Sequence, residues 1–172
     1  LMVAFQAPEI KTPDRYGMRI IDNILGASLS GRLFVKIRDE LGQAYTTSSW
    51  YSPDIDTGNF ILYVLTKADK IDSVKAVIMA QLQDLRDHEV SPEELGTAKI
   101  YLKGALRRSL MTNSALGGRV ALDELYGLGY NAYQQFFGRI DAVTAPDVRR
   151  IAQKYLDISK AAVVITKPKV NK

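Results

Sequence analysis

The sequence predicts an α+β domain in which a mostly antiparallel sheet packs against a layer of helices. Two neighbouring segments rich in β-branched and aromatic residues are separated by a short turn, and most of the chain from residue 69 to 155 has helical spacing of apolar residues. Short apolar segments near both ends add further strands. Strands separated by paired helices are typical of a layered α+β fold. A chain of 172 residues with 47% hydrophobic residues can bury one core, or two small lobes.

The first quarter of the chain predicts a strand followed by two helices. The apolar run 1–8 ends at a proline and is expected to be a strand. Thr12 and Pro13 suit the N-cap and first position of a helix, and Asp14 suits the positive end of its dipole. Gly26 is expected to end this helix. A second helix then runs from the serines at 28–30 to Gly42, which supplies the left-handed residue after a helix.

The middle of the chain predicts an antiparallel hairpin. Residues 44–51 (AYTTSSWY) and 59–66 (NFILYVLT) have the composition of strands, and the segment 52–58 contains the Pro, Asp and Gly of a turn. Because the second strand is almost continuously apolar, we expect it to lie in the interior of the sheet.

The remainder is predicted to be helical up to a final strand. Capping signals, Ser91-Pro92-Glu93-Glu94 and Thr144-Ala145-Pro146-Asp147, begin two of its helices. The expected helices cover residues 69–87, 91–110, 114–126, 132–140 and 144–155, followed by a strand at 161–166 and a basic tail at 167–172. The turn at 89–92 is the best candidate for an internal seam.

Composition excludes several kinds of active site. The chain has no cysteine and one histidine, His88, so a zinc site of the usual His and Cys ligands is not expected. His88 lies in Asp87-His88-Glu89, at the end of a charged helix, and is predicted to be a surface residue rather than a catalytic base. No phosphate-binding glycine motif follows a strand, Asp54 and Asp56 lack the other ligands of a calcium loop, and capping accounts for Glu93 and Glu94.

Charge is distributed unevenly along the chain. Residues 1–90 have 10 Lys and Arg against 12 Asp and Glu, whereas residues 91–172 have 13 against 7. The basic excess raises the alternative of an anionic partner such as a nucleic acid. However, Lys99, Lys103 and Arg107 form one stripe of a helix without interleaved aromatic residues, so a solvated helix face is favoured and no nucleic-acid partner is predicted.

One group of motifs points to a family. The segments are Ser30-Gly31-Arg32-Leu33, Ile37-Arg38-Asp39-Glu40, Gly42-Gln43-Ala44-Tyr45, Gly58-Asn59-Phe60 and Thr66, followed by Val90-Ser91-Pro92-Glu93-Glu94-Leu95 and Val143-Thr144-Ala145-Pro146-Asp147-Val148. In order and spacing, from about residue 1 to 165, they resemble the C-terminal, non-catalytic half of M16 zinc metallopeptidases. This family includes the pitrilysin, insulysin and mitochondrial processing peptidase types.

The resemblance implies a single C-terminal-type domain over residues 1–172 with the LuxS/MPP-like metallohydrolase fold. It further implies a clamshell of two halves, with zinc on a His-x-x-Glu-His helix of the other half. No catalytic residue, metal ligand or cofactor is therefore expected in this chain, which alone is predicted to be inactive. By the same resemblance, Arg38 and Tyr45 are substrate-binding residues that reach across the peptide chamber. A guanidinium and a phenol are suitable donors for a substrate carbonyl or a developing oxyanion.

Several questions stay open at this stage. The implied function is the substrate-binding half of a zinc metalloendopeptidase, whose catalytic half lies in the same chain or in a partner subunit, so a homo- or heterodimer is an option. The alternative is a non-proteolytic structural or assembly subunit of the same fold, as in respiratory-complex core proteins. The chain begins Leu1-Met2, so we expect part of a longer protein. No signal peptide or membrane span is visible, which predicts a soluble domain of unknown compartment.

Overall fold

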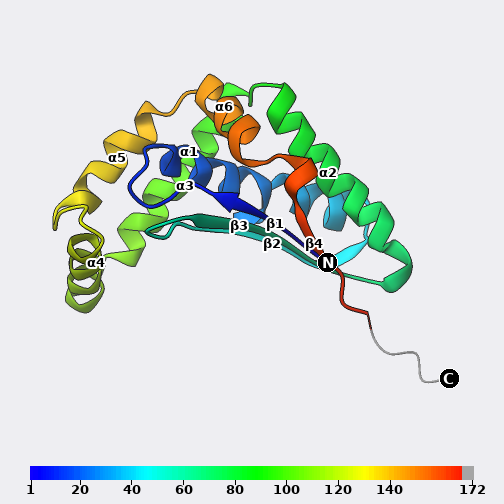
Figure 1. Ribbon diagram of the computed structural model, residues 1–172, viewed down its shortest axis with the longest axis horizontal. Coiled ribbons are helices and arrows are strands. Elements are labelled where there is room, and N and C mark those ends of the chain that lie inside the picture. The colour runs from blue at the N-terminus through cyan, green and yellow to red at the C-terminus, as the bar shows by residue number, and fades with distance from the viewer. Residues whose placement is uncertain (168–172) are drawn as a thin grey trace.

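A four-stranded antiparallel sheet forms one layer of the molecule, and helices cover one of its faces (Figure 1). This arrangement comes from a computed structural model that describes residues 1–167. The strands are β1 (Met2–Ala7), β2 (Ala44–Ser52), β3 (Gly58–Thr66) and β4 (Ala162–Val164). Their order across the sheet is β2-β3-β1-β4, so β2 and β4 are its edges. The α+β layered fold expected from the sequence is confirmed.

Six α-helices account for most of the second layer among the described residues. They are α1 (Asp14–Asp22), α2 (Ile71–Asp87), α3 (Pro92–Ser109), α4 (Asn113–Leu125), α5 (Ala132–Ala142) and α6 (Ala145–Tyr155). Helices α1, α2, α3 and α6 lie over the sheet, whereas α4 lies at the far end of the molecule beyond α5 (Figure 1). Within residues 1–167 no helix combines the length and the apolar composition needed to cross a bilayer.

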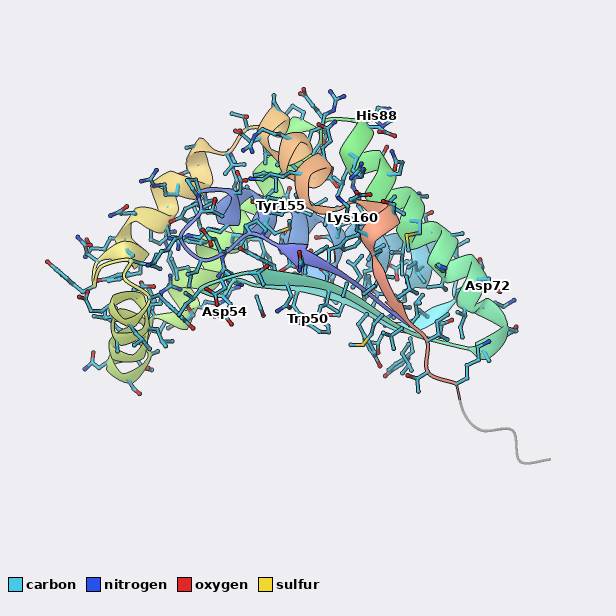
Figure 2. All side chains as sticks on the ribbon, viewed as in Figure 1. Trp50, Asp54, Asp72, His88, Tyr155 and Lys160 are labelled. Carbon is cyan, nitrogen blue, oxygen red and sulfur yellow. The ribbon has the colours of Figure 1, made fainter. Side chains whose placement is uncertain are left out.

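The core lies between the sheet and the helices. Alternate residues of β1 and β3 point into it, as the period of a strand requires, among them Val3, Phe5, Phe60, Leu62 and Val64. The helical layer contributes a larger set of fully buried residues, namely Met18, Ile20, Ile21, Leu25, Leu33, Ile37, Ile78, Leu82, Leu85 and Ile140. The opposite face of the sheet carries no helix, and Trp50 lies on that face (Figure 2).

The hairpin forms as predicted, with β3 in the interior of the sheet. Residues Ser48, Trp50 and Ser52 of β2 face Tyr63, Ile61 and Asn59 of β3. On its other side β3 pairs with β1, so that Phe5 faces Phe60. The last strand is shorter than predicted, because only Ala162–Val164 pairs with β1, and residues 168–172 of the basic tail lie outside the described part of the chain.

Two predicted helix boundaries are wrong. Thr12 does not cap α1, which begins at Asp14 with Pro13 at the N-cap position and no side-chain cap. Gly26 does not end a helix either, because it lies inside a π-helical turn, η1 (Asn23–Ala27). A Cβ at Gly26 would lie 3.0 Å from both the backbone nitrogen and the Oγ of Ser49. Gly26 therefore permits close packing of η1 on β2.

Other predicted helix ends are confirmed. Ser91 Oγ accepts a hydrogen bond from the Glu94 N–H, and Thr144 and Asp147 form a complete capping box. Gly42 has a φ of 60° and follows η2 (Phe34–Glu40), the second π-helical segment, which takes the place of the helix expected before it. A residue that has a Cβ is disfavoured at such a φ, so glycine fits this turn.

Candidate functional site

The turn at Gly42 places Arg38 and Tyr45 near each other. The N–H of Gly42 donates to the Arg38 carbonyl at 3.1 Å, and the N–H of Gln43 donates to the Ile37 carbonyl at 2.9 Å. These hydrogen bonds satisfy backbone carbonyl groups at the end of η2, and the chain then turns into β2. Arg38 therefore lies just before the turn and Tyr45 just after it.

Tyr45 is the extra residue of a β-bulge. Ala44 faces Thr66 and Thr46 faces Leu65, so Tyr45 has no partner of its own on β3. A bulge of this kind bends the strand locally and changes the direction of a side chain. The Tyr45 side chain is 81% exposed. Packing of the ring in the sheet therefore does not account for this tyrosine.

Arg38 lies between two aromatic rings. Its guanidinium carbon is 4.6 Å from the centre of the Phe34 ring and 6.0 Å from the centre of the Tyr45 ring. Both distances lie within the range of cation–π attraction. Neither the Arg38 nor the Tyr45 side chain forms a hydrogen bond or ion pair with any of residues 1–167. The guanidinium and the phenol are thus positioned but available as donors.

A groove lies beside this pair at the edge of the sheet. It has a volume of about 480 Å³ and is lined by Tyr45, Leu65, Lys67, Lys70 and neighbouring residues of the 42–44 turn. The adjacent strand, β2, is an edge strand, so one side of its backbone is unpaired within the described sheet. The groove therefore combines apolar surface and two lysines with the phenol of Tyr45, and the Arg38 guanidinium lies next to that phenol without lining the groove.

Among the residues that the structure describes, no three His, Cys, Asp or Glu side chains are grouped as metal ligands would be. His88 lies at the end of α2, as Figure 2 shows, with its side chain 73% exposed and its Nδ1 2.9 Å from Asp84 Oδ1. The surface position predicted for His88 is confirmed.

Arg32 has a structural role that the sequence analysis missed. Its Nε and one terminal nitrogen each lie 2.7 Å from a carboxylate oxygen of Glu94, and its other terminal nitrogen lies 2.7 Å from Asp84. Capping therefore does not fully account for Glu94, because its carboxylate binds Arg32 instead of returning to the helix end. The feature of the sequence that could have indicated this structural role is the charged residue within the Ser30-Gly31-Arg32-Leu33 motif.

The basic stripe of α3 packs against α5. Lys99 donates to the Asp141 carbonyl at 2.9 Å, Lys103 binds the Asp141 carboxylate at 2.6 Å, and the Arg107 guanidinium lies 5.2 Å from the Phe137 ring centre. Lys99 and Lys103 are half-buried. The expectation of a merely solvated face is wrong, because these cations are held by contacts within the chain.

Comparisons with known proteins identify the family and the fold of this chain. The model of the family described as "Peptidase M16 inactive domain" matches residues 1–102. The chain is 26% identical over 166 residues to the uncharacterized zinc protease YmxG of Bacillus subtilis, covering 96% of this chain and 41% of that protein. The family resemblance seen in the motifs is thereby confirmed.

Two solved structures show the same fold. The peptidase M16 inactive domain from Pseudomonas fluorescens has a TM-score of 0.82 at 23% identity, covering 97% of this chain and 42% of that one. A chain of complex III from Candida albicans has a TM-score of 0.79 at 19% identity, covering 90% of this chain and 39% of that one. The chain thus spans about two-fifths of the length of the curated relative and of both structures.

Proposed function

The chain belongs to the Peptidase M16 inactive domain family, and on this premise we propose that it is the non-catalytic, substrate-binding half of a zinc-dependent metalloendopeptidase. Peptide cleavage would require a second half with a His-x-x-Glu-His zinc helix, in the same parent chain or in a partner subunit. The zinc protease name of the Bacillus subtilis relative, of which this chain covers 41%, supports that assignment.

The proposal depends chiefly on the exposed pair of Arg38 and Tyr45 beside the edge strand. Neither donor has an acceptor within residues 1–167, and the guanidinium carbon lies 6.0 Å from the ring centre, so both can approach one peptide group. Arginine stays charged and donates in a planar fork, and the phenol adds one O–H. Together they would bind a substrate carbonyl and stabilise negative charge that develops on its oxygen.

The edge strand provides a second means of holding a peptide. An extended segment could pair with the part of the β2 edge that precedes Tyr51 and so become a further strand of the sheet, because the Tyr51 N–H itself is already bound by Asp22. The bulge at Tyr45 interrupts regular pairing at the start of β2. A bound peptide would therefore pair beyond the bulge and meet Arg38 and Tyr45 at one end, which sets its position along the strand.

A non-proteolytic assembly subunit is the second candidate. The likeness to a complex III chain supports it, although at 19% identity that likeness concerns the fold alone. Such a subunit would use the fold for contacts with partners. It would have no need for a tyrosine that is 81% exposed next to a guanidinium without an ion pair in the described part of the chain. Arg38 and Tyr45 therefore favour the peptidase half.

The test compares the isolated chain with the assembled enzyme. The chain alone should retain no equimolar zinc after dialysis and should cleave no peptide. In the assembly with its catalytic half, Arg38→Ala should lower kcat/KM by at least about tenfold, because loss of one oxyanion donor costs roughly 2.7–4 kcal/mol elsewhere. Tyr45→Phe should also lower it, since only the O–H is removed.

Lys36→Ala is the matched control for both variants. Lys36 is exposed, lies in the same π-helical segment as Arg38 and pairs only with Glu40 at 3.0 Å. Its substitution should leave kcat/KM unchanged. Equal rates for the wild type and both site variants would refute the substrate-binding role. A wild-type assembly that cleaves no peptide library would favour the assembly subunit.

A further inference from the structure

A second concentration of unsatisfied donors lies at the opposite end of β2. Arg15 and Arg19 of α1 and Arg119 of α4 line a pocket of about 190 Å³. Pro53, which follows β2, also lines it, so the pocket and the Arg38–Tyr45 pair lie at different ends of that strand. Its other walls are mostly apolar and include Tyr16, Leu128 and Phe136, and one carboxylate, that of Asp123, also lines it.

The three arginines differ in how many of their guanidinium N–H groups have a hydrogen-bond acceptor. Arg15 donates to the Ile10 carbonyl and, at 2.7 Å, to the Tyr16 hydroxyl. Arg119 uses its Nε for the buried carboxylate of Asp123 at 2.9 Å, and its two terminal nitrogens have no acceptor within residues 1–167. Arg19 forms no hydrogen bond or ion pair with any described residue and lies 5.8 Å from the Tyr51 ring centre.

Arg19 is a half-buried guanidinium that shares its pocket with two other arginines. Burial lowers the pKa of Arg19; nearby Tyr51 and Asp22 oppose this shift, while Arg119 and Arg15 add to it. Asp22 forms no ion pair with Arg19, and its two carboxylate oxygens accept hydrogen bonds from Ser49 and the Tyr51 N–H. Half-burial removes part of the hydration of this cation, and no acceptor among residues 1–167 replaces it. A bound anion would supply the missing acceptors.

The pocket restricts the kind of anion it can hold. Its planar donors match the two oxygens of a carboxylate, which guanidinium groups bind in a fork. Its apolar walls favour a carbon group next to the charge, and its volume is below the ~300–1,000 Å³ typical of sites for drug-sized ligands. We propose that this pocket binds a small carboxylate that carries an apolar group, with Arg19 and Arg119 as its donors.

Two sources share this chemistry: a free amino-acid-like acid and the C-terminal residue of a peptide. The proposal does not depend on the proposed function, because it uses none of the residues near Arg38 and Tyr45. A failure of the peptidase assay would not affect the carboxylate-binding proposal, and a failure to bind carboxylates would not affect the peptidase proposal.

The experiment is calorimetric titration of the purified chain, with NMR detection of the arginine Nε–H resonances. The first probes are N-acetyl-leucine and its uncharged amide, N-acetyl-leucinamide. The acid should bind and perturb the resonances of Arg19 and Arg119, while the amide should bind at least about tenfold more weakly, since a hydrogen bond to a charged group is worth about 1.5–3 kcal/mol. A pentapeptide ending in leucine, as acid and as amide, then separates the two sources. Binding of the peptide acid identifies a chain terminus, and binding of N-acetyl-leucine alone identifies a free small acid.

Variants assign the binding to this pocket. Arg19→Met keeps most of the side-chain volume, removes the half-buried charge and should lower the affinity for the acid at least about tenfold. Arg119→Gln is a second variant, should Arg19→Met fail to fold, and should also weaken binding. Arg107→Met is the matched control, because Arg107 likewise lies over a ring, 5.2 Å from the Phe137 centre, but outside the pocket.

Three results would overturn the proposal. They are equal affinity for acid and amide, unchanged affinity in both pocket variants, and no binding of the acid or of the peptide acid at 20 mM. Equal binding of inorganic phosphate would also contradict it, because phosphate has no apolar group to occupy the walls.

Discussion

Replacing Arg32 should destabilise the fold through one identifiable set of contacts. Arg32 joins the start of the η2 region to both α2 and α3, through Asp84 and Glu94. Its side chain is 19% exposed, and those of Glu94 and Asp84 are 28% and 46% exposed. The fork to Glu94 is therefore partly shielded from water, while the contact with Asp84 is close to an ordinary surface pair.

The expected magnitude follows from that difference in exposure. We assign about 1.5 kcal/mol to the two charge-assisted bonds with Glu94, the low end for charged hydrogen bonds, and about 0.5 kcal/mol to Asp84, a typical surface value. Arg32→Ala should therefore lower the free energy of unfolding by about 2 kcal/mol. In a chain of this length the melting temperature should fall by about 4–8 °C.

Urea unfolding of the purified chain measures the loss, and a double-mutant cycle with Glu94→Gln isolates the shared interaction. The Glu94 N–H still reaches Ser91 in that variant, so the helix cap is preserved. We expect a coupling energy of about 1 kcal/mol. Lys36→Ala, which breaks an exposed i,i+4 pair, should cost less than about 0.5 kcal/mol. A loss for Arg32→Ala no larger than for this control would refute the reasoning.

Three further predictions concern buried charge and glycines. Burial would raise the pKa of Asp14, but hydrogen bonds from Lys154, Arg150 and Tyr155 outweigh it and keep this pKa below its ordinary value. The Asp14 carboxylate should thus stabilise the fold above its unfolded pKa of about 4, and this stabilisation should be lost as the pH falls through the lower pKa of the folded state. In Asp14→Asn, the free energy of unfolding measured with urea should therefore decrease less steeply with falling pH than in the wild type. Gly58→Ala should destabilise the fold by about 1–3 kcal/mol, because the new Cβ would collide with the carbonyl oxygens of Pro8 and Ser52. Gly96→Ala should instead stabilise the fold by about 0.5–1 kcal/mol in the same assay, because Gly96 lies in open space on α3. Gly42→Ala should cost about 1–2 kcal/mol at its φ of 60°, and a thermal melt no lower than that of the wild type would contradict this.

The parts of the fold that local chemistry determines could be predicted from the sequence. Ser91 and the Thr144–Asp147 pair cap their helices because the oxygen that accepts the N–H is only three residues away. Gly42 ends η2 because a positive φ is cheap only for glycine. The interior position of β3 followed from its apolar composition.

What could not be predicted depends on contacts between distant segments. Gly26 resembled a helix terminator, but its role is set by Ser49 of β2. Glu94 resembled half of a capping box, but Arg32, 62 residues earlier, takes its carboxylate. An apolar pattern at three- and four-residue spacing also does not distinguish an α-helix from the π-helical turns at 23–27 and 34–40.

The two candidate sites differ in the same way, because one depends on residues close in sequence and the other on distant segments. Arg38 and Tyr45 are seven residues apart and joined by one turn, so a motif could indicate them together. Arg19 and Arg119 are 100 residues apart and line one pocket only because α5 packs against both α1 and α4, so no motif contains both.

Strand β2 connects both sites to the core. Asp22 at the end of α1 accepts hydrogen bonds from Ser49 Oγ at 2.6 Å and from the Tyr51 N–H at 3.2 Å, which fixes the middle of β2 against the helix layer. Burial raises the pKa of Asp22, and the hydrogen bond from Ser49 and the one from the Tyr51 backbone oppose that shift, as expected for a carboxylate held in place by donors. Tyr45 and Pro53 lie beyond this anchor on opposite sides. A ligand at one candidate site would therefore meet a strand whose centre does not need to move, so we expect no coupling between ligands at the two candidate sites.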